Sequence, residues 1–192
     1  MVLAACSMRV LLIGFSALLA SMLPTLAQLS QPRASVALPE EVERAIKGLH
    51  PGAAVLTAEE VDVESCGPEA RRDQFFSADF NGDGISDYAA LVRLGEPRQD
   101  REFKVVPIWL VVLLGQRDGK FRVVVLESNR TGTVPTWIVI EPYPPGMVWH
   151  WEGIRTEWLT FPGIGVSYCE KAGRVFYWSS KAGRFRHIQT SD

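Results

Sequence analysis

The residues best suited to chemistry lie in one acidic stretch, residues 79–87, which reads Asp-Phe-Asn-Gly-Asp-Gly-Ile-Ser-Asp. Oxygen-bearing side chains alternate there, and glycines stand where the backbone would have to turn sharply. A hard cation such as calcium takes roughly six to eight oxygen ligands, and short loops of this kind supply them. Without a cation the aspartates would repel one another, since two charges about 4 Å apart cost around 4 kcal/mol at an effective dielectric near 20. The stretch therefore predicts a calcium-binding loop.

The pattern around this loop resembles one family of calcium repeats. An EF-hand requires a bidentate glutamate where this chain has Ala90, so that pattern does not apply. Residues 75–92 instead resemble the FG-GAP (VCBS-type) repeat, in which Asp-x-Asn-Gly-Asp-Gly-x-x-Asp precedes a strand of small apolar residues. The resemblance implies a strand, a calcium loop and a second strand, with ligands from Asp79, Asn81, Asp83, Ile85 and Asp87.

Two other interpretations of the loop stay open. It can be an acidic Asx-turn that binds no ion, or a loop in which calcium acts only as a structural staple. The family's propellers repeat the motif several times, whereas this chain contains it once. Because a propeller blade takes roughly 40–45 residues and repeat folds need about three or more units, we expect a single calcium-clipped hairpin rather than a full propeller.

The first 27 residues have the features of an export signal. Arg9 supplies a positive start, an apolar run follows over residues 10–23, and Ala27 is a small residue at the expected cleavage point. The run is shorter than the roughly 20 residues that a membrane helix needs. We therefore expect an exported protein, periplasmic or secreted, without a membrane span in its mature form. The predicted parts are a signal peptide (1–27), a flexible tether (28–38) and one β-rich domain (39–192).

Two cysteines, Cys66 and Cys169, remain after the signal, and an even number in an oxidising compartment predicts a disulfide. The bond would close a loop of about 100 residues, worth up to roughly 4–5 kcal/mol in the chain-entropy treatment. Two buried free thiols are the alternative.

The formal net charge of −2 gives no indication of a basic surface that would bind nucleic acid. Calcium is the cofactor that we expect.

Hydrophobic patterning predicts a mainly β fold, α+β with a single N-terminal helix and antiparallel, blade-like hairpins. The helix is expected over residues 39–49, where apolar residues recur at helical spacing. The Asp-Gly pair within residues 116–120 predicts a hairpin turn, and Pro107 predicts a bulge or an edge near the start of a buried strand. Strands are expected over residues 74–78, 88–94, 104–114, 121–127, 133–141, 148–152, 155–161, 165–170, 174–179 and 184–190.

Aromatic residues cluster late in the chain, and alternation along a strand would place Trp149 and Trp151 on one face. With Trp158 they could form a platform for a carbohydrate or a protein partner, although packing in the core is the commoner use of tryptophan. His150 and Glu152 would share the opposite face and could act as acid and base in a hydrolase. Three functions are therefore compatible with the sequence: a calcium-stabilised exported module with a structural or binding role, a recognition module that uses the aromatic face, and a hydrolase.

Overall fold

The computed structural model describes residues 37–61, 66–70, 72, 74–96, 98–100, 103–128, 134–135, 138–153, 155–169 and 171–192. The predicted signal peptide and most of the predicted tether lie outside these residues. In the part of the chain that is described, no helix is long and apolar enough to cross a membrane.

Helix α1 (Glu40–Lys47) is amphipathic and begins after Pro39. Its first turn is acidic, and an ion pair of 2.7 Å joins Glu40 to Arg44 one turn later, so the charges complement the helix dipole. Val42 and Ile46 are buried against the first sheet. The prediction of one N-terminal helix is confirmed.

The first sheet contains five strands: β1 (Ala53–Val55), β2 (Phe75–Ala78), β3 (Asp87–Leu94), β6 (Ile108–Gly115) and β7 (Phe121–Ser128). β3 and β6 form its centre, and both are buried along almost their whole length. Alternate residues face opposite sides: Ala90 and Val92 join the helix cluster, while Ala89 and Leu91 face a second sheet. β6 is the buried strand that was expected within residues 104–114, and it is likewise covered on both faces.

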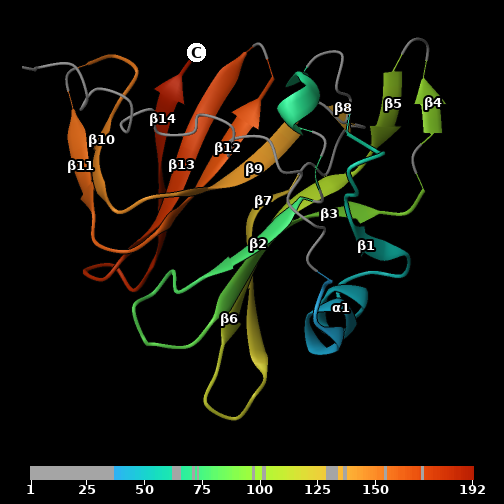
Figure 1. Ribbon diagram of the computed structural model, residues 1–192, viewed down its shortest axis with the longest axis horizontal. Coiled ribbons are helices and arrows are strands. Elements are labelled where there is room, and N and C mark those ends of the chain that lie inside the picture. The colour runs from blue at the N-terminus through green and yellow to red at the C-terminus, as the bar shows by residue number, and fades with distance from the viewer. Residues whose placement is uncertain are drawn as a thin grey trace, which may run out of the picture. The chain divides into compact units, whose positions relative to one another are not determined.

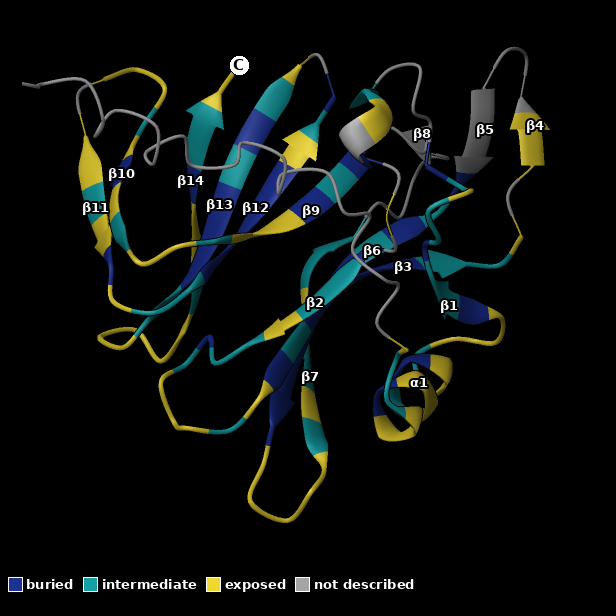
Figure 2. Ribbon diagram, in the orientation of Figure 1, coloured by how far each residue is buried: buried dark blue, intermediate teal, exposed yellow. Residues whose placement is uncertain are grey.

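The second sheet has the order β14 (Arg184–Ser191), β13 (Ala172–Ser179), β12 (Gly163–Tyr168) and β9 (Ile138–Tyr143). One of its faces packs on the first sheet through Ile140, Ile164, Val166 and Phe176. Its other face is covered by the hairpin of β10 (Gly146–Trp149) and β11 (Thr156–Leu159), through Val148 and Leu159. Figure 1 shows this succession of helix, sheet, sheet and hairpin, and Figure 2 shows buried residues along the strands of the two sheets.

Smaller elements complete the described structure. They are the 3-10 helix η2 (Pro68–Ala70) and a three-stranded sheet of β4 (Arg98–Asp100), β5 (Phe103–Val106) and β8 (Val134–Pro135). The predicted disulfide is confirmed: Cys66 and Cys169 are bonded, with Cα atoms 4.8 Å apart, across 103 residues of sequence. It ties the segment before η2 to the residue that follows β12.

The mainly β, antiparallel prediction is confirmed, since every strand pairing among the described residues is antiparallel. Pro107 separates β5 from β6, and these two strands lie in different sheets. Proline interrupts the strand there because it has no N–H to donate to the hydrogen-bond ladder of a sheet.

Three of the expected strands were wrong in extent. Residues 104–114 and 133–141 each include parts of two strands in different sheets, β5 and β6 in the first case and β8 and β9 in the second. Residues 148–152 are not one strand. β10 ends at Trp149, and residues 151–153 form a turn in which the Gly153 N–H donates to the His150 carbonyl at 2.8 Å.

Candidate metal centre

The acidic loop joins β2 to β3, as the resemblance implies. The two strands pair antiparallel, and Ala78 opposite Asp87 is the last pair before the loop opens. β3 continues into the centre of the first sheet, so the exit of the loop is fixed by the core. In Figure 1 the loop extends from the end of the β2–β3 hairpin.

Asp79 organises the backbone of the loop. Its Oδ1 accepts from the N–H groups of Gly82 at 2.7 Å and Asp83 at 3.2 Å, and its Oδ2 accepts from Gly84 N–H at 2.9 Å. Gly82 and Gly84 have φ values of +75° and +81°, which glycine adopts without steric cost. Three consecutive backbone N–H groups therefore converge on a single carboxylate.

Asn81 and Asp83 form the outer part of the loop. Asn81 Oδ1 accepts from Asp83 N–H at 3.0 Å, and its Nδ2 donates to Asp83 Oδ2 at 3.0 Å. Asp83 Oδ1 in turn accepts from Ile85 N–H at 2.8 Å. Asp83 is exposed, and Asn81 and Ile85 are half-buried. Asn81 and Asp83 thus hold backbone N–H groups of the loop itself.

Asp87 is placed differently, because its carboxylate is fully buried. Its Oδ2 accepts from Phe80 N–H at 3.0 Å, and its Oδ1 accepts from Gly115 N–H, at the end of β6, at 2.8 Å. Burial raises the pKa of Asp87 to about 6; these two N–H groups oppose the rise, and the negative charges of Asp83 and Asp79 add to it. Asp87 therefore links the loop to the neighbouring strand.

Apolar contacts fix the same loop to the core. Phe80 is fully buried, and its ring lies 5.8 Å from that of Phe76 and 6.4 Å from that of Phe185 on β14. On the outside, a Cβ added at Gly82 would lie 2.1 Å from the ring of Phe161, so that ring covers the glycine closely. The loop therefore contacts residues of both sheets and the segment after β11.

The oxygen set can be tested against a hard cation. A carboxylate has about four lone-pair sites and an amide oxygen has two, so Asp79, Asn81 and Asp83 each keep at least one beyond the bonds above. This all-oxygen chemistry suits calcium. Across the described residues, however, no group of three or more His, Cys, Asp and Glu side chains is placed to hold a metal ion. Both oxygens of Asp87 accept from backbone N–H groups inside the fold.

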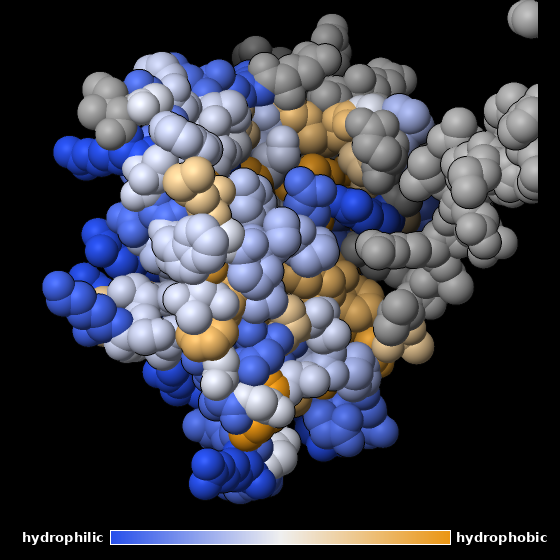
Figure 3. Space-filling view, turned by 60° about the vertical axis from the view of Figure 1, so that its left-hand side comes forward, coloured by the Kyte–Doolittle hydropathy of each residue, from blue (hydrophilic) through white to orange (hydrophobic). Residues whose placement is uncertain are grey.

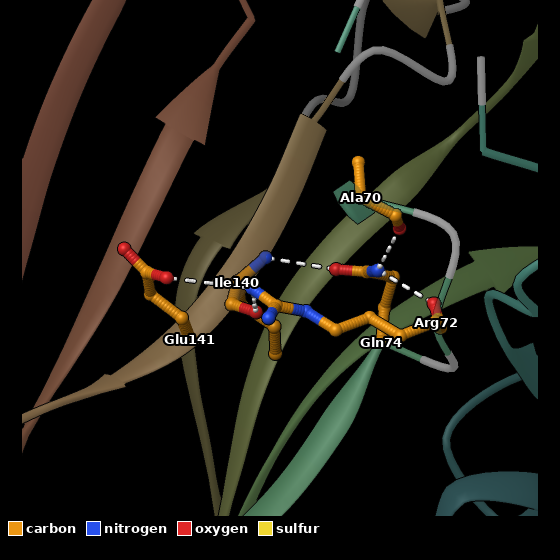
Figure 4. Close-up of polar contacts among 5 residues, drawn as sticks. All are labelled: Ala70, Arg72, Gln74, Ile140 and Glu141. Carbon is orange, nitrogen blue, oxygen red and sulfur yellow. Dashed lines mark hydrogen bonds and ion pairs between the residues drawn. The ribbon is translucent and has the colours of Figure 1, made fainter. Parts of the chain in front are cut away.

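A second polar cluster, which the sequence analysis missed, lies where the two sheets meet. Gln74 is fully buried just before β2. Its Nε2 donates to the carbonyls of Arg72 at 2.7 Å and Ala70 at 3.3 Å, and its Oε1 accepts from Ile140 N–H at 2.8 Å (Figure 4). Arg72 donates to the Ile140 carbonyl at 3.2 Å and pairs with Glu141 at 3.4 Å. We call these five residues the Gln74 clasp.

The Gln74 clasp covers the edge of the second sheet that is formed by β9. β9 is the outermost strand of its sheet, and its Ile140 N–H and C=O would otherwise be free to pair with another chain. Gln74 also belongs to the first sheet by its backbone, since Leu91 N–H donates to its carbonyl at 2.9 Å. The clasp is therefore a structural link between the sheets. No sequence motif signals it, because Gln74 and Ile140 are 66 residues apart.

The remaining predicted site residues lie on and beside the β10–β11 hairpin. Trp149 and Trp158 are exposed on its strands, with Trp151 exposed in the turn that follows β10. The expectation that Trp149 and Trp151 share one strand face is wrong, because the strand ends between them. For the same reason His150 and Glu152 do not share the opposite strand face, and Glu152 is exposed in the turn.

Comparison of the chain with protein-family models, with curated proteins and with solved structures finds no significant match.

Proposed function

We propose that this protein is an exported, calcium-binding β-rich module in which the ion stabilises the 79–87 loop, with a structural or binding role. The observation that carries the proposal is the arrangement at Asp79, where three backbone N–H groups converge on one carboxylate and leave Asn81 and Asp83 on the open side. These bonds hold the backbone of the Asp-x-Asn-x-Asp-Gly segment in a curled conformation, which supports the proposal.

Charge supports the same proposal. The negative charges of Asp79 and Asp83 both add to the raised pKa of buried Asp87, so each of them repels the Asp87 carboxylate. A divalent cation beside them would offset this repulsion. Asp79, Asn81 and Asp83 would hold the ion. Asp87 would stabilise the site from the inside, by holding Phe80 and Gly115, and its charge would add to the attraction.

Export is the second part of the proposal. The Cys66–Cys169 disulfide supports it, since such bonds form and persist in oxidising compartments. The N-terminal signal expected from the sequence points the same way.

Calorimetric titration of the purified protein with calcium, after treatment with a chelator, tests the calcium site. We expect saturable binding and a higher melting temperature, because a ligand at about 100 times its Kd adds roughly 2.7 kcal/mol to the free energy of unfolding. The Asp83→Ala variant should lose both effects. Asp118→Ala is the matched control, since Asp118 also caps an exposed Asp-Gly turn, accepting from Lys120 N–H at 3.1 Å, but stands outside the loop. Absence of binding heat and of a melting shift at millimolar calcium would remove the proposal.

A further inference from the structure

The outer face of the β10–β11 hairpin is apolar and uncovered in the described structure. Val148 and Leu159 point inward and are buried, so by alternation Met147, Trp149 and Trp158 point outward. Met147 lies directly opposite Trp158, and Trp149 is the diagonal neighbour of Trp158. Their exposed fractions are 53%, 56% and 71%. We call these three residues the tryptophan face.

The tryptophan face is rigidly supported. Val148 and Leu159 pack with Val175, Tyr177 and Ile188 of the second sheet, which fixes the hairpin from below. At the open end of β10, the N–H of Trp151 donates to the Gln189 carbonyl of β14 at 3.0 Å. A ligand on this face would therefore meet rings whose backbone is already ordered, which lowers the entropic cost of binding.

Size argues against a protein partner. An aromatic side chain offers about 150–250 Å², so the exposed parts of Trp149, Trp158 and also Trp151 together amount to roughly 250–450 Å². A stable protein interface needs about 800 Å² from each partner. The patch is nevertheless as large as the functional patches of many monomers, at roughly 300–600 Å². It suits a narrow ligand that contacts the rings alone.

Composition argues against a membrane surface. The face contains no leucine, isoleucine or phenylalanine to enter the acyl region, and its other outward residue is Thr156, opposite Trp149. In the turn, the exposed Glu152 and Arg155 carry opposite charges, so the rim gives no net attraction to anionic lipid. Figure 3 turns this side of the molecule forward and shows pale side chains of intermediate hydropathy beside charged ones.

We propose that the tryptophan face binds an uncharged polysaccharide chain of β-1,4-linked pyranose units, such as glucose or N-acetylglucosamine. The flat faces of these sugars present C–H groups, whose partial positive charge is attracted to the negative face of an indole ring. Trp149 and Trp158 stack on successive parts of the chain, and Thr156, Glu152 and Arg155 bond to the hydroxyl groups at its edges. The proposal does not depend on calcium, because the face is built on the second sheet.

Calorimetric titration with the β-1,4-linked hexamers of N-acetylglucosamine and of glucose tests this proposal, because its signal does not depend on the tryptophans that the variants remove. We expect saturable binding of at least one hexamer, and the Trp149→Ala/Trp158→Ala double variant should bind at least about tenfold more weakly. The Trp149→Phe/Trp158→Phe variant should recover part of the loss, because it keeps the rings. Val125→Ala, on β7, is the control, since Val125 is also an exposed apolar residue, at 43%, on a different sheet.

Melting temperatures of the variants, measured in parallel, separate loss of the face from loss of the fold. The proposal is overturned if the wild-type protein binds neither hexamer, or if the double alanine variant is folded and binds as well as the wild type. It is overturned equally if the wild type binds neutral or anionic phospholipid vesicles through these tryptophans, or if it dimerises through them in sedimentation experiments. These outcomes would assign the face to lipid or to a second copy of the chain.

Discussion

The Gln74 clasp and the 79–87 loop are two polar clusters that follow one another along the chain and differ in where their partners lie. In the clasp, each polar group of the buried Gln74 side chain is satisfied by backbone from a distant or neighbouring segment. In the loop, most partners are N–H groups of the loop itself, and Asp79, Asn81 and Asp83 retain lone pairs that these bonds do not use. A closed cluster of the first kind stabilises a fold, whereas an open cluster of the second kind can also take a ligand.

The two clusters also differ in how they are anchored. The clasp is anchored by hydrogen bonds to Ile140, whereas the loop is anchored by an apolar ring, Phe80, inserted between the sheets. The loop also contains a fully buried carboxylate, Asp87. The comparison can be tested by removing each anchor in turn and then by changing the open side of the loop.

Replacing Phe80 with alanine should have the largest effect. The ring is fully buried and contacts Phe76 and Phe185, so its removal leaves a cavity between the sheets and should cost about 3–5 kcal/mol of unfolding free energy. Urea denaturation measures this loss. Phe161→Ala is the control at the outer side of the loop, where Phe161 is half-buried, and it should cost less. Equal losses for the two variants would mean that the loop has no apolar anchor in the core.

Replacing Gln74 with alanine should cost about 2–4 kcal/mol, because it leaves Ile140 N–H and the Arg72 carbonyl without partners and opens a small cavity; the Ala70 carbonyl keeps its bond from Arg72 N–H at 2.8 Å. The denaturation midpoint measures the change. Gln116→Ala, in the exposed turn after β6, is the matched control and should lie within about 0.5 kcal/mol of the wild type. Should Gln74→Ala prove as mild as this control, the clasp would not hold the sheets together.

The contrast between the clusters also explains what the sequence could predict. The loop was located from the sequence because its chemistry is local: alternate oxygens, glycines at the turns and a following apolar strand all lie within one short segment. The disulfide was predicted from the cysteine count and the expected compartment. The clasp was missed because nothing near Gln74 distinguishes it from a surface glutamine, and its partner Ile140 is distant in sequence.

Orientation was harder to predict than position. Asp87 has the sequence spacing of a ligand, yet it shares a strand face with Ala89 and Leu91 and therefore points between the sheets. Trp151 continues the alternation of Trp149 in sequence, but β10 ends before it and the chain turns. In both cases tertiary packing decides where the side chain points, and a local pattern does not contain that information.

Substitutions at the two loop glycines distinguish the cost of a steric clash from the cost of backbone strain. Gly82 and Gly84 have similar positive φ values, but a Cβ at Gly82 would meet the Phe161 ring at 2.1 Å, whereas a Cβ at Gly84 would have nothing within 4 Å. We expect Gly84→Ala to cost about 1 kcal/mol from the backbone alone, and Gly82→Ala to cost roughly 1–2 kcal/mol more. Thermal unfolding of both variants measures the difference. In a Phe161→Ala background the gap between them should close; a gap that persists would place the strain elsewhere.

The smallest effect on stability, and the one that separates the loop most clearly from the clasp, is expected for Asp83→Asn. The substitution keeps an oxygen that can accept from Ile85 N–H and loses only the exposed bond from Asn81 Nδ2, so without calcium the free energy of unfolding should stay within about 0.5 kcal/mol of the wild type. With calcium the same variant should gain less stability than the wild type, by roughly 1.4 kcal/mol for each tenfold loss of affinity at saturating ion. Thermal unfolding in chelator and in calcium gives both numbers. If the stability of the variant falls equally in both conditions, the loop is a closed structural cluster like the clasp, because an open cation site requires its outer carboxylate only when the ion is present.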